Sequence, residues 1–132
     1  MVDKINVLLI EDDPIDVGAV QEMLKDSADI EINLIITTNL AQGLKQLAND
    51  HIHVILLDLN LPDSKGIHTY IEFRKAAAKT PIIIMSGLTD KELIYQALQQ
   101  GAIDYLIKGN MESESLMRAI LYAIWSREKD TQ

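Results

Sequence analysis

The sequence contains no cysteine among its 132 residues. This absence excludes disulfide bonds, a thiolate nucleophile and a cysteine-based zinc site, and it is compatible with a cytoplasmic location. No apolar run approaches the ~18 residues that a membrane span needs. The stretch MVDKINVLLIEDD meets acidic residues too early for a secretory signal, and the glycine spacings lack the Gly-Lys-Ser/Thr ending of a nucleotide P-loop. We expect a soluble, cytoplasmic domain without membrane contact.

Basic residues are also scarce, since 12 Lys and Arg stand against 20 Asp and Glu and give a net charge of −8. Nucleic acid is an unfavourable partner for so acidic a domain, so we expect no direct nucleic-acid contact. A small cation is the expected electrostatic partner. The chain is 48% apolar, and its length is that of one ordinary domain with a real core.

Short, continuous Val/Ile/Leu runs alternate with segments of helical length. Such runs are typical of strands buried on both faces of a parallel sheet. Five strands alternating with five helices predict a three-layer, doubly wound α/β fold with the flavodoxin-like strand order 2-1-3-4-5. The domain would cover 1–128, and 129–132 would form a polar tail or the start of a linker. The expected strands are 5–10, 30–36, 53–58, 81–86 and 103–107, and the expected helices are 14–26, 39–49, 65–78, 90–100 and 113–128.

Local signals support several helix boundaries. Asp13 followed by Pro14 is typical of an N-cap and a first helical residue. Thr89 with Glu92 is typical of a capping box.

Other polar residues are expected to be structural. Asp63 and Ser64 are expected to cap the helix at 65–78 rather than to take part in chemistry. The histidines lack the spacing of a metal site and are expected to be solvated or hydrogen-bonded: His51, His53 and His68.

Four of the predicted strands run into reactive polar residues, and these would meet at the carboxyl edge of the sheet, where open α/β sheets bind ligands. In the predicted order the first and third strands are neighbours, ~4.8 Å apart. Their carboxylates would therefore crowd together and raise one another's pKa values unless a cation is bound. An oxygen-only site of this kind favours Mg²⁺ over Ca²⁺. The residues are Glu11 with Asp12, Asp58, Ser86 and Lys108.

Four motifs follow one another on these elements: LLIEDDP, LLDLNLPDSKG, IIIMSG and GAIDYLIKG. In this order they resemble the acidic pair, the phosphoacceptor strand with its loop, the switch-hydroxyl strand, and the strand with an aromatic residue and a lysine in receiver domains of bacterial two-component response regulators. The resemblance covers about residues 5–125. It is specific, because several motifs fall in the right order on the right elements.

The resemblance implies a role for each residue of the acidic edge. Asp58 would be the phosphoacceptor. Asp12 and Asp58 would bind Mg²⁺ or Mn²⁺ directly, together with the backbone carbonyl of Asn60, and Glu11 would be an outer-sphere ligand.

The resemblance also implies how a signal would be received. Ser86 and Lys108 would hold phosphoryl oxygens, and Tyr105 would turn inward on activation. The chain would take its phosphoryl group from a sensor histidine kinase or a phosphotransfer protein and lose it slowly by hydrolysis, so it would not be a turnover enzyme on a free substrate. The signal would reach an output domain or protein partner as a population shift.

The chain departs from the common receiver pattern at two positions. Ser86 stands where threonine is also frequent, so the hydroxyl is kept without the methyl group that restricts its rotamer. Gly109 stands where many receivers carry a proline joined by a cis bond. Because a non-proline cis bond costs ~3 kcal/mol, we expect a trans bond here.

Three alternatives compete with this interpretation. A haloacid-dehalogenase-type phosphatase also uses an aspartyl phosphate and Mg²⁺, but it places the nucleophile after the first strand. A flavodoxin-like binding module needs hydroxyls and amides after the first strand, where this chain carries acid. A degenerate receiver would act only as a protein-interaction module.

The helix at 113–128 carries a second apolar ridge beside its core face. The ridge consists of Met117, Leu121 and Trp125, spaced four apart. One hypothesis makes it a surface for homodimerisation or output docking. The other places Met117 and Leu121 at the margin of the core, with only Trp125 loose.

Overall fold

The computed structural model describes residues 4–25, 30–49, 51–87 and 90–130. Its main sheet is parallel, with the order β2-β1-β3-β6-β7. Counted along the chain, this is the predicted order 2-1-3-4-5. The strands of this sheet are β1 (Lys4–Ile10), β2 (Glu31–Thr37), β3 (Val54–Asp58), β6 (Ile82–Ser86) and β7 (Asp104–Ile107).

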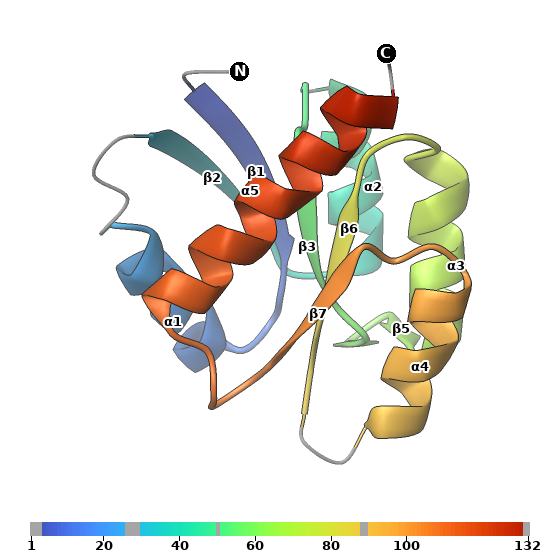
Figure 1. Ribbon diagram of the computed structural model, residues 1–132. Helices are drawn as coiled ribbons and strands as arrows, with labels where there is room; N and C mark the ends of the chain where they lie inside the picture. The colour runs from blue at the N-terminus through green and yellow to red at the C-terminus, as the bar shows by residue number, and fades with distance from the viewer. Residues whose placement is uncertain (1–3, 26–29, 50, 88–89, 131–132) are drawn as a thin grey trace.

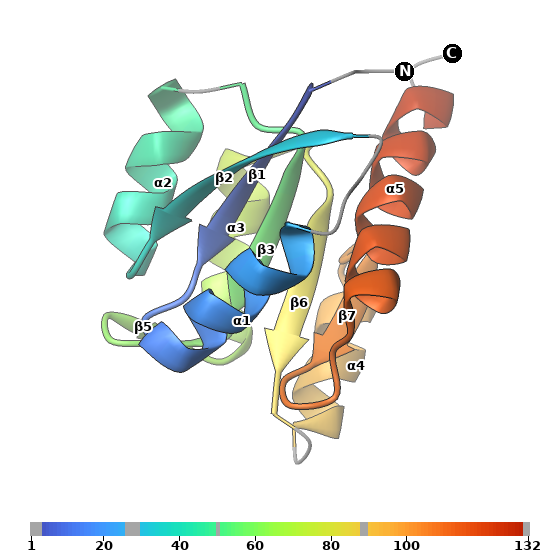
Figure 2. The same cartoon turned by 90° about the vertical axis from the view of Figure 1, so that its left-hand side faces the viewer.

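Helices cover both faces of the sheet, as predicted for a three-layer fold. In Figure 1, α1 and α5 lie on one face and α2, α3 and α4 on the other. Figure 2 shows α2 and α5 on opposite sides of the sheet. The helices are α1 (Pro14–Leu24), α2 (Leu40–Asn49), α3 (Ile67–Ala76), α4 (Lys91–Gln99) and α5 (Ser113–Asp130). None of the helices in the described ranges is long and apolar enough to cross a membrane.

Alternating strand residues fill two separate layers of the core. Val7 and Leu9 face the layer that α1 and α5 cover, whereas Leu8 and Ile10 face the layer under α2, α3 and α4. All four are fully buried. Because the central strands are apolar on both faces, their polar chemistry is confined to the ends of the strands.

The loop after β3 contains a two-stranded ribbon that the sequence pattern did not predict. Its strands are β4 (Asn60–Leu61) and β5 (Ser64–Lys65). The ribbon delays α3, which begins at Ile67 instead of 65, after Gly66 with a φ of 76°.

Asp63 caps a helix, as expected, but the predicted helix was wrong. Its carboxylate accepts the backbone N–H groups of Leu40 at 2.8 Å and Ala41 at 3.1 Å, so it caps α2 and not α3. Desolvation opposes the effect, but these backbone donors lower the pKa of Asp63. Ser64 instead shares a hydrogen bond with the Thr69 hydroxyl at 2.7 Å.

The N-cap of α1 is confirmed, because the Asp13 carboxylate accepts the Ile15 N–H at 2.9 Å and Pro14 opens the helix. Thr89 of the expected capping box lies outside the described residues, and Asp90 occupies the N-cap position of α4.

His53 lies just before β3, at the amino edge of the sheet, and its ring is hydrogen-bonded as expected. Its Nδ1 accepts the backbone N–H of Asn6 at 2.9 Å, which requires an unprotonated Nδ1. Burial lowers the pKa of His53, and the nearby His51 and Arg127 lower it further.

We expect acidification to destabilise the protein through His53. Its folded-state pKa lies below the ordinary 6.5, so the unfolded chain binds more protons as the pH falls through that value. The stability that neutral His53 contributes is therefore complete well above pH 6.5 and lost below it. Urea unfolding midpoints at about pH 7.5 and about pH 5.5 measure this loss.

The loss should be smaller in His53→Asn, which keeps an acceptor but does not titrate. His68→Asn, at an exposed position, should lose as much as the wild type. Equal losses in all three proteins would contradict the role of His53.

Candidate functional site

The carboxyl edge of the sheet brings together one ammonium group and three carboxylates. Lys108 Nζ lies 2.6 Å from Glu11 Oε1, 2.9 Å from Asp58 Oδ2 and 3.3 Å from Asp16 Oδ2. The backbone N–H of Lys108 extends the sheet ladder to the Ser86 carbonyl at 2.9 Å, which places the lysine beside the end of β6.

Glu11 is the most buried carboxylate of this group, with its side chain 0% exposed. Burial raises the pKa of Glu11 to about 7, with the Asp58 carboxylate adding to the effect and Lys108 opposing it. Burial alone would lower the pKa of Lys108, but the carboxylates of Glu11 and Asp58 raise it above its ordinary value. Lys108 therefore stays charged, and Glu11 can take up a proton near neutral pH when no other cation is close.

The carboxylates of Glu11, Asp12 and Asp58 fit a divalent cation. One oxygen from each lies within 4.8 Å of the others. Glu11 Oε1 is buried and faces the ammonium of Lys108. Asp12 is exposed beside them. Oxygen ligands that are partly buried and partly open to water suit Mg²⁺, which usually keeps several waters.

Asp58 borders a small cavity of about 210 Å³. The carboxylate is held in place, because Oδ1 accepts the Asn60 N–H at 3.1 Å and Oδ2 accepts a hydrogen bond from Lys108 at 2.9 Å. The predicted residues Asn60 and Ser86 line the same cavity, together with Leu59, Lys65, Gly66, Asp90 and Leu93. Space for a small group thus adjoins the Asp58 carboxylate.

Tyr105 lies in β7, and Gly109 lies in the turn after this strand. The Tyr105 side chain is 44% exposed, so it points outward in this structure. Gly109 has a φ of 88°, and no peptide bond within the described ranges is cis. The bond before Gly109 is thus trans, as expected.

The predicted ridge on α5 is divided. Met117 and Leu121 are half-buried and pack against the core, whereas Trp125 is 54% exposed. The exposed neighbour of Trp125 is Tyr122, whose ring centroid lies 6.0 Å away. Of the two hypotheses, the marginal-core interpretation therefore describes Met117 and Leu121.

Two residues of the site were missed by the sequence analysis. Asp16, from the first turn of α1, is the third carboxylate around Lys108. Asp90 accepts a hydrogen bond from the Ser86 hydroxyl at 2.9 Å. An acidic residue at a helix N-cap or in the first helical turn is ordinary, so only the contact itself distinguishes these two.

The sequence profile described as "Response regulator receiver domain" matches residues 7–121. The chain belongs to this family. Its sequence is 36% identical over 105 residues to the probable C4-dicarboxylate response regulator DctR of Bacillus subtilis. This match covers 77% of this chain and 45% of DctR. It is 37% identical over 124 residues to the cell cycle response regulator CtrA of Brucella ovis, covering 93% of this chain and 51% of CtrA. The chain thus spans about half the length of these curated relatives.

Solved structures show the same fold. A response regulator receiver domain protein of Clostridium thermocellum has a TM-score of 0.83 at 23% identity, with coverage of 97% of this chain and 99% of that chain. The receiver domain of the sensor histidine kinase PA1611 of Pseudomonas aeruginosa, solved with magnesium in its active-site cleft, has a TM-score of 0.77 at 24% identity, with coverage of 92% and 98%.

Substitutions at Asp12 and Asp13 should separate metal binding from helix capping. Asp12→Ala removes one oxygen of the carboxylate cluster and should weaken Mg²⁺ binding by at least about tenfold, a loss typical even of outer-shell partners. Asp13→Ala should cost only about 1 kcal/mol of unfolding free energy, because it removes a cap. Calorimetric Mg²⁺ titration and urea unfolding measure the two effects. The reverse pattern would show that Asp13 is the ligand.

Proposed function

We propose that this receiver domain accepts a phosphoryl group on Asp58, in the cytoplasm, from a sensor histidine kinase or a phosphotransfer protein. The observation that supports this most strongly is the position of Asp58. It is a buried carboxylate, paired with Lys108 and bordering a cavity that Ser86 also lines. The nucleophile and a hydroxyl donor thus border one small space, and the Lys108 ammonium contacts the nucleophile.

The transfer requires an Asp58 oxygen to form a bond to phosphorus while the bond from phosphorus to the donor's nitrogen breaks. Because the Asn60 N–H and Lys108 orient the two carboxylate oxygens, Asp58 would need little reorientation for the attack. Lys108 and the Ser86 hydroxyl would donate hydrogen bonds to the phosphoryl oxygens, where negative charge collects. Hydrolysis returns the carboxylate when water attacks the phosphorus.

Mg²⁺ would be held by the carboxylates of Asp12 and Asp58 and by the Asn60 carbonyl, with Glu11 acting through water. When bound, the ion supplies charge neutralisation for the phosphoryl oxygens. The magnesium in the PA1611 receiver supports this choice of metal, and Mn²⁺ has similar ligand preferences.

Asp58→Asn should abolish phosphorylation. The wild type, incubated with Mg²⁺ and acetyl phosphate, should gain the mass of one phosphoryl group, because Asp58 is the carboxylate beside both Lys108 and the cavity. Intact-protein mass spectrometry measures the gain. Asp63→Asn is a matched control in the same loop, since asparagine still caps a helix, and it should be phosphorylated like the wild type.

Lys108→Ala should distinguish phosphoryl contact from metal binding. This variant should bind Mg²⁺ as tightly as the wild type or more tightly, because it removes a competing cation, while its phosphorylation is impaired. Loss of Mg²⁺ binding in Lys108→Ala would contradict the assigned role.

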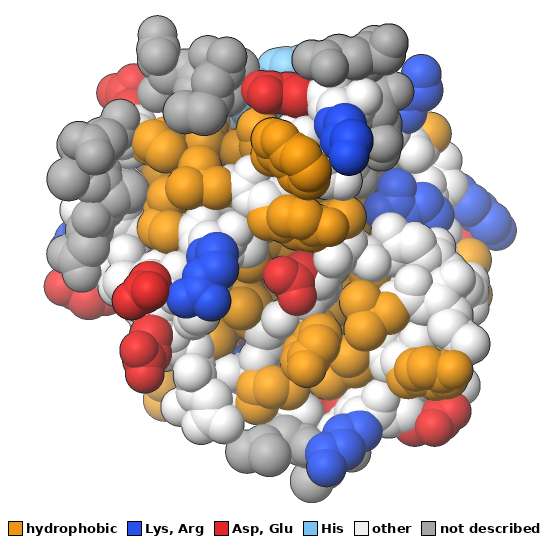
Figure 3. Space-filling view, viewed as in Figure 1, with side chains coloured by type: hydrophobic (Ala, Val, Ile, Leu, Met, Phe, Trp, Pro, Cys, Tyr) orange, Lys and Arg blue, Asp and Glu red, His pale blue; other side chains and the backbone are white. Residues whose placement is uncertain are grey.

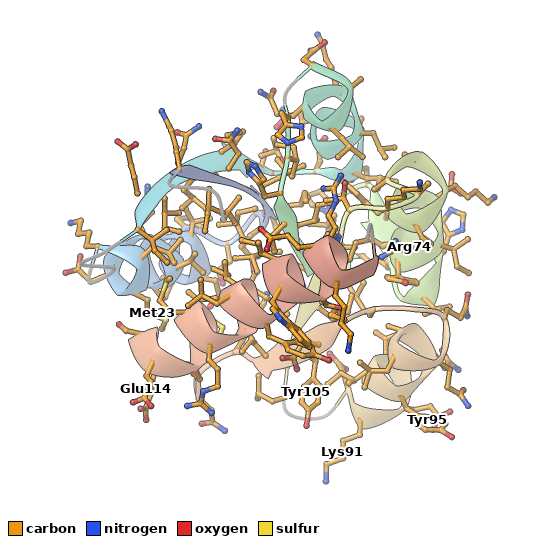
Figure 4. The ribbon with its side chains drawn as sticks, turned by 45° about the horizontal axis from the view of Figure 1, so that its top comes forward. Met23, Arg74, Lys91, Tyr95, Tyr105 and Glu114 are labelled. Atoms are coloured by element: carbon orange, nitrogen blue, oxygen red, sulfur yellow. The ribbon has the colours of Figure 1, made fainter. Side chains whose placement is uncertain are left out.

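We further propose that phosphorylation changes an aromatic surface on the side of α5, β7 and α4. Tyr122 and Trp125 of α5 are 49% and 54% exposed, and Tyr105 of β7 is 44% exposed. Figure 3 shows apolar side chains gathered on this side of the molecule. In Figure 4, Tyr105 lies between α5 and the helix that carries Tyr95. A groove of about 480 Å³ between β7 and α5, lined in part by Tyr105 and Tyr122, belongs to the same surface.

The occupant that we propose for this surface is a second copy of the chain. Both signs of charge border the groove, because Asp104 and Arg118 line it, and a surface of mixed charge can be complementary to itself across a two-fold axis. Inward rotation of Tyr105 would reshape the groove when Asp58 is phosphorylated, so that association depends on the modification.

Trp125→Ala should weaken self-association of the protein when it is loaded with beryllofluoride, a mimic of the phosphoryl group on Asp58. Removal of a large exposed aromatic anchor typically costs ~2 kcal/mol or more at an interface. Sedimentation velocity over a concentration series measures the change. Ile15→Ala removes an exposed apolar side chain of α1 and should leave association unchanged. Equal association of Trp125→Ala and the wild type would contradict the surface.

A further inference from the structure

Asp90 directs its carboxylate at the switch hydroxyl instead of at its own helix. Its Oδ2 accepts the O–H of Ser86 at 2.9 Å, and its backbone N–H donates to the Gly87 carbonyl at 3.2 Å. Asp90 occupies the N-cap position of α4, yet its side chain makes no capping hydrogen bond. An aspartate at this position ordinarily accepts the N–H groups of the first helical turn. The contact with Ser86 thus replaces the usual cap.

The Ser86–Asp90 hydrogen bond lies at the wall of the space beside Asp58 that a phosphoryl group would need. Both residues line the cavity of about 210 Å³ that Asp58 borders. The Ser86 hydroxyl has a single proton to donate, so phosphoryl oxygens on Asp58 and the Asp90 carboxylate would compete for it. Conversion of the Asp58 carboxylate to an acyl phosphate replaces one negative charge by about two, and the added charge would repel the carboxylate of Asp90.

We infer that Asp90 is a positioning residue that holds Ser86 away from the phosphoryl site until that site is filled. This inference rests on the function proposed above. Occupation of the site draws the hydroxyl to the phosphoryl oxygens and releases the Asp90 carboxylate. The released carboxylate is then free to cap the first turn of α4, where a negative charge is favoured by the helix dipole. Phosphorylation thereby exchanges one hydrogen bond of Asp90 for another and acts directly on the N-terminus of α4.

The inference predicts that removal of Asp90 strengthens occupation of the site. Beryllofluoride is the probe, titrated into protein saturated with Mg²⁺ and followed by amide NMR. Asp90→Ala should bind it about tenfold more tightly than the wild type, because a hydrogen bond to a charged acceptor no longer competes for Ser86. Asp90→Asn keeps an acceptor oxygen without the charge and should show an intermediate gain.

Glu92→Ala is the matched control. Glu92 is an exposed acidic residue in the first turn of the same helix. Its removal changes the net charge equally without touching Ser86, so its affinity for beryllofluoride should stay close to that of the wild type.

A double-mutant cycle with Ser86→Ala tests whether Asp90 acts through the hydroxyl. In the Ser86→Ala background, Asp90→Ala should lose most of its tenfold gain, because no proton remains for which to compete. A purely structural role in closing the turn with Gly87 would instead lower thermal stability equally in both backgrounds and leave the cycle additive.

The outcomes separate this inference from the proposed function. A wild-type protein that binds no beryllofluoride in the presence of Mg²⁺ would overturn the phosphoryl site itself. A wild type that binds, together with unchanged or weaker binding in both Asp90 variants, would overturn the role of Asp90 alone. A full tenfold gain that persists without the Ser86 hydroxyl would do the same.

Discussion

The Lys108 ammonium is the charge around which the acidic edge of this receiver domain is organised. It lies within ion-pair distance of Glu11, Asp16 and Asp58, three carboxylates that would otherwise repel one another in a poorly solvated space. Each partner comes from a different segment, so the ammonium also joins the end of β1, the first turn of α1 and the end of β3 to β7. Breaking a partly buried pair of this kind leaves an uncompensated charge, which is strongly destabilising. A divalent cation at the same edge would take over part of this neutralising task and would free Lys108 to follow the phosphoryl group.

Close packing beneath the edge keeps these charges in register. Gly43 of α2 illustrates the tightness, because a Cβ built there would lie 2.6 Å from the Phe73 ring and 2.8 Å from Ile10. Any larger residue would have to displace these two side chains or the helix. Because apolar layers pack on both faces of the strands, the backbone at the strand ends is held in place. The reactive side chains at these ends are held in place with it. Under the proposed function, the parts that would move are the hydroxyl of Ser86, the outward ring of Tyr105 and the start of α4.

The sequence was sufficient for the architecture and for the residues at the strand ends. Buried parallel strands have a strong apolar signature, and the strand order then dictates which ends are neighbours, so Glu11, Asp12 and Asp58 could be grouped in advance. Contacts that depend on side-chain direction across distant segments could not be foreseen. Asp63 caps α2 from 22 or more residues away, and local capping rules favour the nearer helix. Asp16 and Asp90 fit ordinary helix-start positions equally well, and the α5 ridge was divided because helical spacing alone does not tell a core margin from an open face.

The ribbon formed by β4 and β5 is bonded both to α2 and within its own loop. The Asp63 carboxylate, at the turn of the ribbon, accepts backbone N–H groups of α2. The Lys65 ammonium donates to the Asn60 side-chain oxygen at 2.7 Å, and the Gly66 N–H donates to the Leu59 carbonyl at 2.7 Å. Surface loops usually tolerate changes in length during evolution. Here an insertion between Asn60 and Gly66 would uncap α2 and shift the amide that orients Asp58 in one event. The length of this loop should therefore be as constrained in evolution as the identity of a core residue. Related chains should differ in length at other loops.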